Sequence, residues 1–117
     1  MNNQLETKDK ISIAKEFTKE PGARYKYEGN HSGELFLEIL LRDRFIKALN
    51  ENYVLEIDLD GVVGFPPSFV SGSFGVLSVE QGFQNVLNHI SFKSADQEKI
   101  ERFLSEVRNP KTRPRAK

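Results

Sequence analysis

The chain has 117 residues, of which 38% are hydrophobic and 29% are charged, with nine Phe and three Tyr. This length and composition are those of one folded domain, and they exclude a wholly disordered chain. Seventeen Lys and Arg balance seventeen Asp and Glu, so no overall charge attracts nucleic acid or anionic lipid, and the absence of Cys excludes disulfides and thiol catalysis.

The first half of the chain predicts two strands and a helix. Alternating apolar residues predict a strand over 11–17 and a second strand over 24–28, which a Pro-Gly turn joins into a hairpin. A helix is predicted over 32–49, with its first Ser as the N-cap. Arg42 and Asp43 interrupt its apolar stripe. Either the helix bends there, with Asp43 capping a second segment, or the pair reaches solvent past the edge of the sheet.

The second half predicts alternating strands and helices. Residues 53–60 alternate as the central strand, and a loop over 61–67 leads to a helix over 68–79, whose small residues should allow a close approach to the sheet. A further strand is predicted over 86–92. The last helix, over 94–108, begins with a Ser and a Gln that are spaced as a capping box, and it has the clearest amphipathic stripe.

This order of elements, ββαβαβα, predicts a single-domain α/β fold. Strands separated by helices favour parallel neighbours, and the hairpin adds an antiparallel pair, so we expect a mixed β-sheet with its helices mainly on one face. One hydrophobic core should contain Ile57, Leu59, Phe74, Leu77, Ile90, Phe103 and Leu104.

Both ends of the chain are polar. Residues 1–10 are expected to be a flexible N-terminus, and no stretch has the apolar length of a secretory signal or a membrane span. Residues 109–117 contain four basic side chains and no acid, which predicts a basic disordered tail. Because the tail lacks interleaved aromatic residues, nucleic acid is not an expected partner. We expect a cytoplasmic protein with no membrane contact.

Several short segments together resemble the bacterial STAS-like domain family of unknown function. They are Gly22-Ala23-Arg24, Ser32-Gly33-Glu34, the run Val54-Leu55-Glu56-Ile57-Asp58-Leu59-Asp60-Gly61-Val62, and Ser68-Phe69. The resemblance covers residues 11–108 and implies a STAS-like fold for that domain. The family is related in fold to the STAS domains of anti-sigma factor antagonists, which implies a regulatory, non-enzymatic role in binding a kinase-type ATPase or an anti-sigma factor.

The same resemblance implies a phosphorylated Ser at the start of the helix after the central strand. This position falls on Ser68, although the Asp-Ser-Ser-Gly of true antagonists reads Pro66-Pro67-Ser68-Phe69 here. The preceding loop is more apolar than a solvated loop requires, so we expect a partner-binding surface at Phe65, Pro66, Pro67, Ser68 and Phe69. Alternatively, the apolar residues close one end of the core, and Ser68 is only an N-cap.

A second resemblance offers an enzymatic alternative. Asp58-Leu59-Asp60-Gly61 is similar to the first motif of haloacid-dehalogenase-type phosphatases, in which the first Asp is a nucleophile and the second a general acid beside Mg²⁺. Such a site also needs further acids and a Lys at successive strand ends, and no paired acids follow the last predicted strand. With only His31 and His89 as histidines and no Cys, we expect no catalytic residue, metal or cofactor.

An anion site is the remaining candidate. Arg24, His31 and the backbone N–H groups after Ser32 and Gly33 could converge on an anion at the start of the first helix. The alternative is structural: Ser32 caps the helix, Gly33 relieves crowding, and Arg24 pairs with Glu34 or Asp58.

Overall fold

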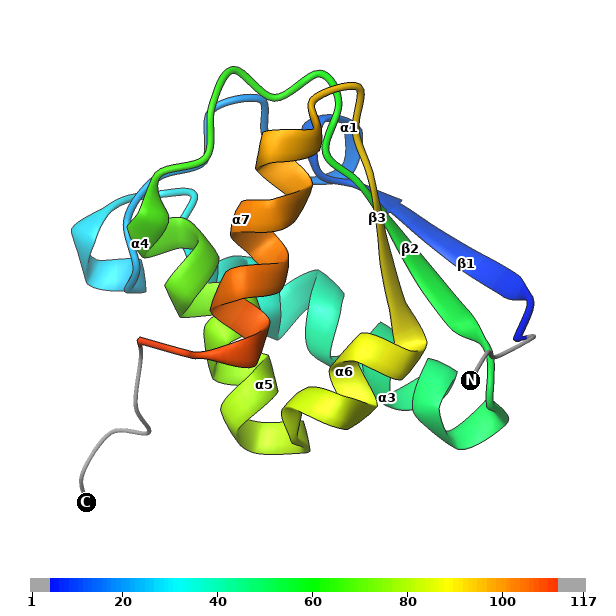
Figure 1. Cartoon of the computed structure of the whole chain (residues 1–117). Coiled ribbons are helices and arrows are strands. Elements are labelled where there is room, and N and C mark those ends of the chain that lie inside the picture. Colours follow the sequence, from blue (N-terminus) through cyan, green and yellow to red (C-terminus); the bar gives the residue numbers. More distant parts are fainter. Residues whose placement is uncertain (1–4, 112–117) are drawn as a thin grey trace.

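The computed structural model describes residues 5–111 of the chain and contains one parallel sheet. Its strands are β1 (Thr7–Ser12), β2 (Val54–Asp58) and β3 (Ile90–Lys93), in the spatial order β1-β2-β3 (Figure 1). Both neighbouring pairs run parallel, so the expectation of a mixed sheet is wrong. The α/β class and the central position of β2 are confirmed.

The predicted hairpin does not form. Strand β1 begins at Thr7, inside the segment expected to be flexible, and the chain then turns into the short helix α1 (Ile13–Glu16). The second predicted strand is instead a loop with the 3₁₀ turn η1 (Lys26–Glu28). There the Glu28 carboxylate accepts hydrogen bonds from the N–H groups of Arg24 and Tyr25. These local bonds occupy two donors that a hairpin ladder would need.

The first long helix is confirmed, and it is continuous through α2 (Gly33–Phe36), the π-helical segment η2 (Leu37–Leu41) and α3 (Arg42–Glu51). The Ser32 hydroxyl caps it by accepting from the Leu35 N–H at 3.0 Å. Asp43 does not cap a second segment, because Leu41 precedes α3 in helical conformation without a side-chain cap. Arg42 instead makes two hydrogen bonds to Glu80 on a neighbouring helix.

The second crossover is also helical, through α4 (Pro67–Val70), the π-helical η3 (Ser71–Gly75) and α5 (Val76–Gln81). The strand predicted over 86–92 is wrong in its first part, which belongs to α6 (Phe83–His89). Its apolar residues fit a helix as well as a strand, since Phe83, Val86, Leu87 and Ile90 follow helical spacing. The last helix, α7 (Gln97–Arg108), is confirmed, but its N-cap is Asp96 rather than Ser94.

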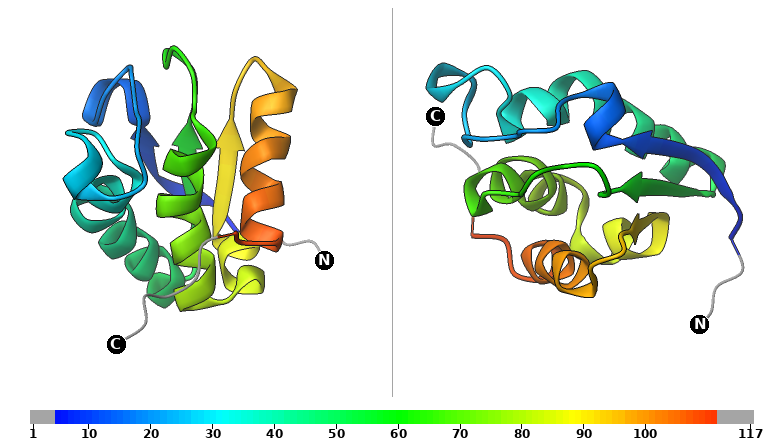
Figure 2. Two further views of the ribbon diagram at one scale, coloured as in Figure 1. Left: turned by 90° about the vertical axis from the view of Figure 1, so that its left-hand side faces the viewer. Right: turned by 90° about the horizontal axis from the view of Figure 1, so that it is seen from above.

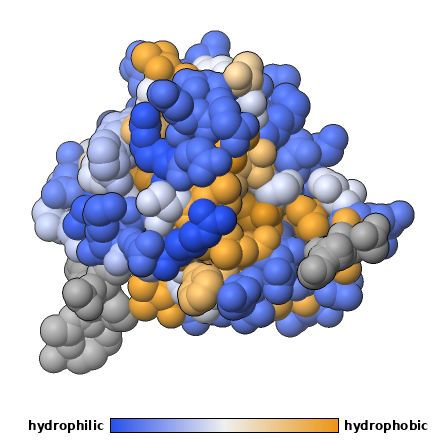
Figure 3. Space-filling model, in the orientation of Figure 1, coloured by the Kyte–Doolittle hydropathy of each residue, from blue (hydrophilic) through white to orange (hydrophobic). Residues whose placement is uncertain are grey.

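The helices lie on one side of the sheet, as the two views of Figure 2 show. Side chains alternate accordingly along β2: Leu55 and Ile57 are buried against the helices, whereas Val54, Glu56 and Asp58 are only half-buried. The predicted core residues are buried except Leu104, which is half-exposed. A strip of apolar surface is visible between α7 and β3 (Figure 3). Helix α7 carries the half-buried Ile100, and β3 carries the half-buried Phe92. No helix within residues 5–111 is long and apolar enough to cross a membrane.

Glycines allow the elements of the helical layer to pack closely. A Cβ on Gly33 would lie 2.9 Å from backbone atoms of Gly72 and Ser73, so α2 and η3 touch backbone to backbone at this position. A Cβ on Gly75 would lie 2.7 Å from the Glu106 carboxylate on α7. The small residues of the second crossover therefore allow η3 to pack closely on α2 and α7. The close approach expected from the sequence was between this helix and the sheet.

Candidate functional site

The carboxyl ends of the strands and the loops that follow them form one end of the molecule, at the top of Figure 1. The loop after β2 is joined to the loop after β1 by a hydrogen bond from the Val63 N–H to the Lys19 carbonyl at 2.8 Å. Open parallel sheets commonly bind ligands at this end of their strands. Most of the side chains singled out in the sequence lie on these two loops and on the helix starts that follow them.

The Asp58-Leu59-Asp60-Gly61 motif connects the loop after β2 to the loop after β3 through hydrogen bonds. Asp58 Oδ1 accepts from the Asp60 N–H at 2.9 Å, and Asp60 Oδ1 accepts from the Ala95 N–H at 2.9 Å. The Lys93 ammonium lies 3.4 Å from Asp60 Oδ2 and 3.9 Å from Asp58 Oδ2. The Ala95 N–H, together with Lys93, holds the pKa of the Asp60 carboxyl below its ordinary value.

These contacts bear on the phosphatase alternative. Asp58 points neither into the core nor to Arg24; it lies on the open face of the sheet beside Lys93. Within residues 5–111, no group of three or more His, Asp or Glu side chains is arranged to hold a metal ion. One oxygen of each carboxylate is already an acceptor: Asp58 Oδ1 bonds within its own loop, and Asp60 Oδ1 bonds to Ala95, just before α7.

Two of the five residues expected to bind a partner belong to the core. Phe65 is 5% exposed and packs edge-to-face on Phe103 at 4.9 Å between ring centroids, while Phe69 is fully buried beside Phe36. Both rings are almost entirely withdrawn from solvent, as expected where apolar residues close one end of the core. Lys99 lies above the Phe65 ring, 6.0 Å from its centroid.

The other three residues are accessible. Pro67 is exposed, and Pro66 and Ser68 are half-exposed. Pro66 occupies the N-cap position of α4, with its carbonyl accepting from the Phe69 N–H, so Ser68 is the second residue of the helix and not its cap. The Ser68 side chain therefore has no capping role in this helix.

The expected anion site at Ser32 and Gly33 lacks its donors. The Gly33 N–H donates to the Ala23 carbonyl at 3.1 Å, and the Glu34 N–H donates to the Arg24 carbonyl at 2.9 Å. Ser32 is fully buried, with its hydroxyl used as the cap. The structural alternative thus accounts for Ser32 and Gly33, whereas Arg24 pairs with neither Glu34 nor Asp58 among the described ion pairs.

Arg24 instead shares a pocket with Ser68. This pocket has a volume of about 350 Å³ and is lined by Ala23, Arg24, Tyr25, Glu28 and Ser68. A second pocket of about 390 Å³ lies between the same two loops and is lined by Glu20, Pro21, Val63, Gly64, Phe65 and Pro66. The sequence pattern did not bring these loops together, since it placed one of them in a hairpin.

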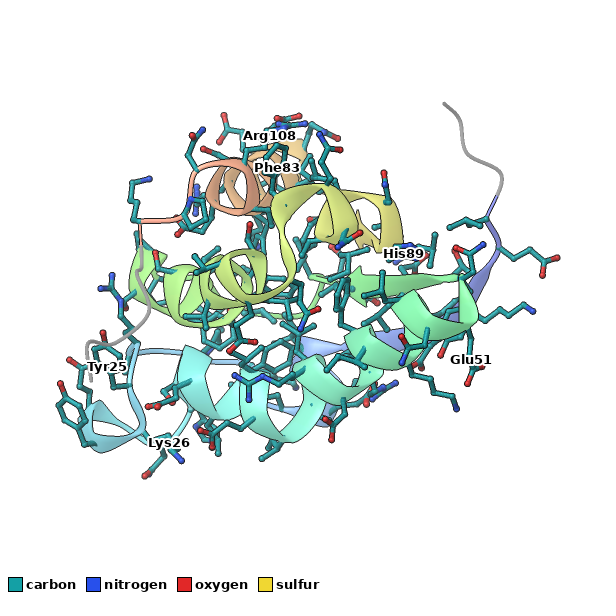
Figure 4. The ribbon with its side chains drawn as sticks, turned by 90° about the horizontal axis from the view of Figure 1, so that it is seen from below. Tyr25, Lys26, Glu51, Phe83, His89 and Arg108 are labelled. Atoms are coloured by element: carbon teal, nitrogen blue, oxygen red, sulfur yellow. The ribbon has the colours of Figure 1, made fainter. Side chains whose placement is uncertain are left out.

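The most exposed apolar side chains at this end are not among the site residues predicted from the sequence. Tyr27 is 79% exposed and stacks on Tyr25, with 5.6 Å between ring centroids, and Val63 is 76% exposed. Figure 4 shows Tyr25 and Lys26 at one corner of the molecule, away from His89 and Glu51. The alternation of two Tyr with charged residues was the available signal, but it was interpreted as a strand. His89 is structural, with Nδ1 2.9 Å from the Tyr53 carbonyl oxygen.

The comparisons with known proteins give one match. The family model for a STAS-like domain of unknown function matches residues 39–99, which include the Asp58 motif and Ser68 but not Arg24. No curated protein and no solved structure matches the chain significantly. The resemblance inferred from the short segments is confirmed, and because the match spans more than half of the 117 residues, the chain belongs to the family of STAS-like domains of unknown function.

Proposed function

We propose that this chain is a non-enzymatic regulatory domain that acts by binding another protein. The observation that carries the proposal is the exposure of apolar side chains on the two joined loops at the carboxyl ends of the strands. Val63 is 76% exposed beside a pocket, while the neighbouring Phe65 holds the loop against the core. Binding residues are commonly carried by loops that a rigid scaffold positions. We call this region, formed by Val63, Pro66, Pro67 and Ser68, the loop surface.

The class of partner, and the regulation of binding by phosphorylation, are proposed from the resemblance. A kinase-type ATPase or an anti-sigma factor is the expected partner, in the cytoplasm, with Ser68 as the candidate phosphorylation site. Two features support this choice: Ser68 is half-exposed, and its hydroxyl is not required as a helix cap. A phosphate there would add about −1.5 to −2 charges to the loop surface, which would repel an acidic or apolar partner.

The absence of catalysis is part of the same proposal. It is supported by the use of Asp58 and Asp60 as acceptors for backbone N–H groups and by their pairing with Lys93. The alternative, a small Mg²⁺-dependent phosphatase or phosphotransferase, would need these oxygens for the metal and the reacting phosphate. We therefore expect no phosphoester turnover with Mg²⁺; turnover that Asp58→Asn abolishes in a folded protein would overturn the proposal.

The binding proposal is tested by co-purification from the native host with a tagged chain, followed by mass spectrometry. Val63→Asp should remove the specifically recovered partner, because it places a charge on the apolar part of the loop surface. Ser68→Asp should weaken recovery, whereas Ser68→Ala should not. Partner recovery equal to wild type with Val63→Asp and Ser68→Asp, with both variants folded, would contradict the proposed surface.

The matched control is Phe83→Ser. Phe83 is also a large exposed apolar residue, at 44%, but it begins α6 and lies beside Arg108 in Figure 4, away from the loop surface. Its substitution should leave partner recovery unchanged. Equal loss of the partner with Phe83→Ser and Val63→Asp would show that binding follows general surface apolarity and not this site.

A further inference from the structure

We infer that the pocket beside Ser68 binds an oxyanion, with the guanidinium of Arg24 as its principal ligand. The pocket lies between the loop after β1 and the start of α4 and has a volume of about 350 Å³. The inference concerns the same end of the molecule as the loop surface, but it does not depend on the proposed function, because the binding of a small anion is measured on the chain alone.

The first observation is the unpaired state of Arg24. Its Nε is fully buried and has no hydrogen-bond partner among residues 5–111, and its guanidinium makes no ion pair with a described residue. Among the other described Arg residues, Arg42 pairs with Glu80 and Arg44 with Asp9. Arg102 and Arg108 also make no described ion pair, but both are exposed, whereas Arg24 is half-buried. Nε itself is shielded from a ligand in the pocket, but the two terminal nitrogens of the guanidinium are not buried and make no described hydrogen bond, so they are the donors that a ligand can reach.

The second observation is that the backbone holds Arg24 in this position. Its carbonyl accepts from the Glu34 N–H at 2.9 Å, and its N–H donates to Glu28 Oε1 at 3.1 Å. Its stem packs on Gly72, where a Cβ would come within 3.1 Å of Arg24 Cγ. The backbone and the first part of the side chain are thus placed before any ligand arrives, which reduces the entropy lost on binding.

The lining of the pocket determines the class of ligand. A guanidinium presents parallel N–H donors that match two oxygens of a carboxylate or a phosphoryl group. Ser68 lines the same pocket, and a Ser hydroxyl can act as a further donor. The shared chemistry of the ligand is therefore an oxyanion with two or more acceptor oxygens, from either a phosphoryl or a carboxylate group.

The negative charge of Glu28 should weaken the binding of an anion, and this expectation can be tested by substitution. Glu28 lines the pocket, and its Oε1 accepts from the N–H groups of two other lining residues, Arg24 and Tyr25. A negative charge at the wall weakens the attraction for an anion. Glu28→Gln retains the accepting oxygen and removes the charge, so this variant should bind oxyanions more tightly than the wild-type chain.

The experiment is a titration of the ¹⁵N-labelled full chain with inorganic phosphate and, separately, with acetate, at constant pH and ionic strength. The buried Nε–H of Arg24 is itself the reporter, together with the backbone amides of Arg24 and Ser68. We expect saturable shifts at these signals with at least one of the two anions. A preference for phosphate assigns the site to phosphoryl groups, and a preference for acetate assigns it to carboxylates.

Four variants complete the test. Arg24→Gln should weaken binding by about tenfold or more, and Ser68→Ala by a smaller factor, since a charged donor contributes more than a neutral one. Glu28→Gln should strengthen binding. The control is Arg108→Gln, which should leave binding unchanged, because Arg108 is exposed and lies far from the pocket residue Tyr25 in Figure 4. Absence of saturable shifts with both anions, or binding that is equal in wild type, Arg24→Gln and Glu28→Gln, would overturn the inference while leaving the loop surface untouched.

Discussion

One face of the three-stranded sheet is packed against helices, whereas the other presents charged side chains to solvent. On the packed face, Ile11, Leu55 and Ile57 are fully buried. On the open face, Glu56 is level with Lys10 of β1, and Asp58 is level with Lys93 of β3. Parallel sheets are usually covered on both faces. Because strand order follows chain order here, right-handed crossovers place their helices on the same side, and the open face must be polar.

The packed face is expected to contribute most of the free energy of unfolding. The packed face carries an aromatic cluster in which Phe103 contacts Phe65, Phe74 and Phe92 at centroid distances of 4.9 to 5.2 Å. The open face has hydrogen bonds and ion pairs near its surface, which contribute little in water. Substitutions on the two faces should therefore differ greatly in their effect on the free energy of unfolding.

The largest effect is expected for Phe103→Ala. Removing this fully buried ring should lower the free energy of unfolding by about 3–5 kcal/mol, because it leaves a cavity among three other rings. The urea midpoint measures the change. An unchanged midpoint would contradict the packing of α7 on the covered face.

A smaller loss is expected for Gly33→Ala. The new Cβ would meet the backbone of Gly72 and Ser73, which cannot move as a side chain can, so a loss of about 1–3 kcal/mol is expected. Gly22→Ala is the matched control, since a Cβ there has open space around it. Equal midpoints for the two variants would show that α2 and η3 do not touch as described.

Arg44→Met tests the charged margin of the covered face. Arg44 donates to both carboxylate oxygens of Asp9, at 2.7 and 3.0 Å, and to Glu16 at 2.8 Å. Because these pairs are partly exposed, the expected loss is about 1–2 kcal/mol.

The same pair predicts a dependence on pH. Hydrogen bonds from Arg44 hold the pKa of the Asp9 carboxyl below its ordinary value. The resulting stabilisation is complete at neutral pH and is lost as the pH falls through the lowered pKa of the folded state. Urea midpoints measured between neutral and acidic pH should fall less steeply in Arg44→Met than in wild type. Identical slopes would contradict this role of Asp9.

The smallest effect is expected on the open face. Glu56→Ala should change the free energy of unfolding by no more than about 0.5 kcal/mol, since the side chain has no described partner in the core. Its neighbour in β2, Ile57→Ala, should cost about 2–5 kcal/mol, because Ile57 is fully buried. Similar midpoints for these adjacent substitutions would remove the distinction between the two faces.

The sequence could predict those elements whose pattern has one interpretation. The alternation over β2, the amphipathic stripe of α7 and the Ser32 cap each left little choice, and the structure confirms them. The pattern failed where two periods coexist, as at α6, and where local bonds from Glu28 replaced a ladder. Hydrophobic periodicity reports which residues are buried, but it does not report which hydrogen bonds compete.

The candidate site was predictable only in part. Ser68 and Arg24 belong to separate motifs of the sequence, and tertiary packing, including that of Gly72 on Arg24, brings them to one pocket. The apolar composition of the loop after β2 was recognised, yet composition could not separate buried Phe65 from exposed Val63. That distinction depends on the contact between Phe65 and Phe103, which are far apart in the chain.

The parallel register also has a consequence for how the chain folds. Each strand pair joins residues that a whole crossover separates, as Ile11 with Ile57 and Ile57 with Phe92, so no local hairpin can nucleate the sheet. During synthesis, Phe65 and Phe74 leave the ribosome before Phe92 and Phe103, the rings that cover them. The nascent chain therefore exposes half of its aromatic cluster until α7 has emerged, and only then can the domain close.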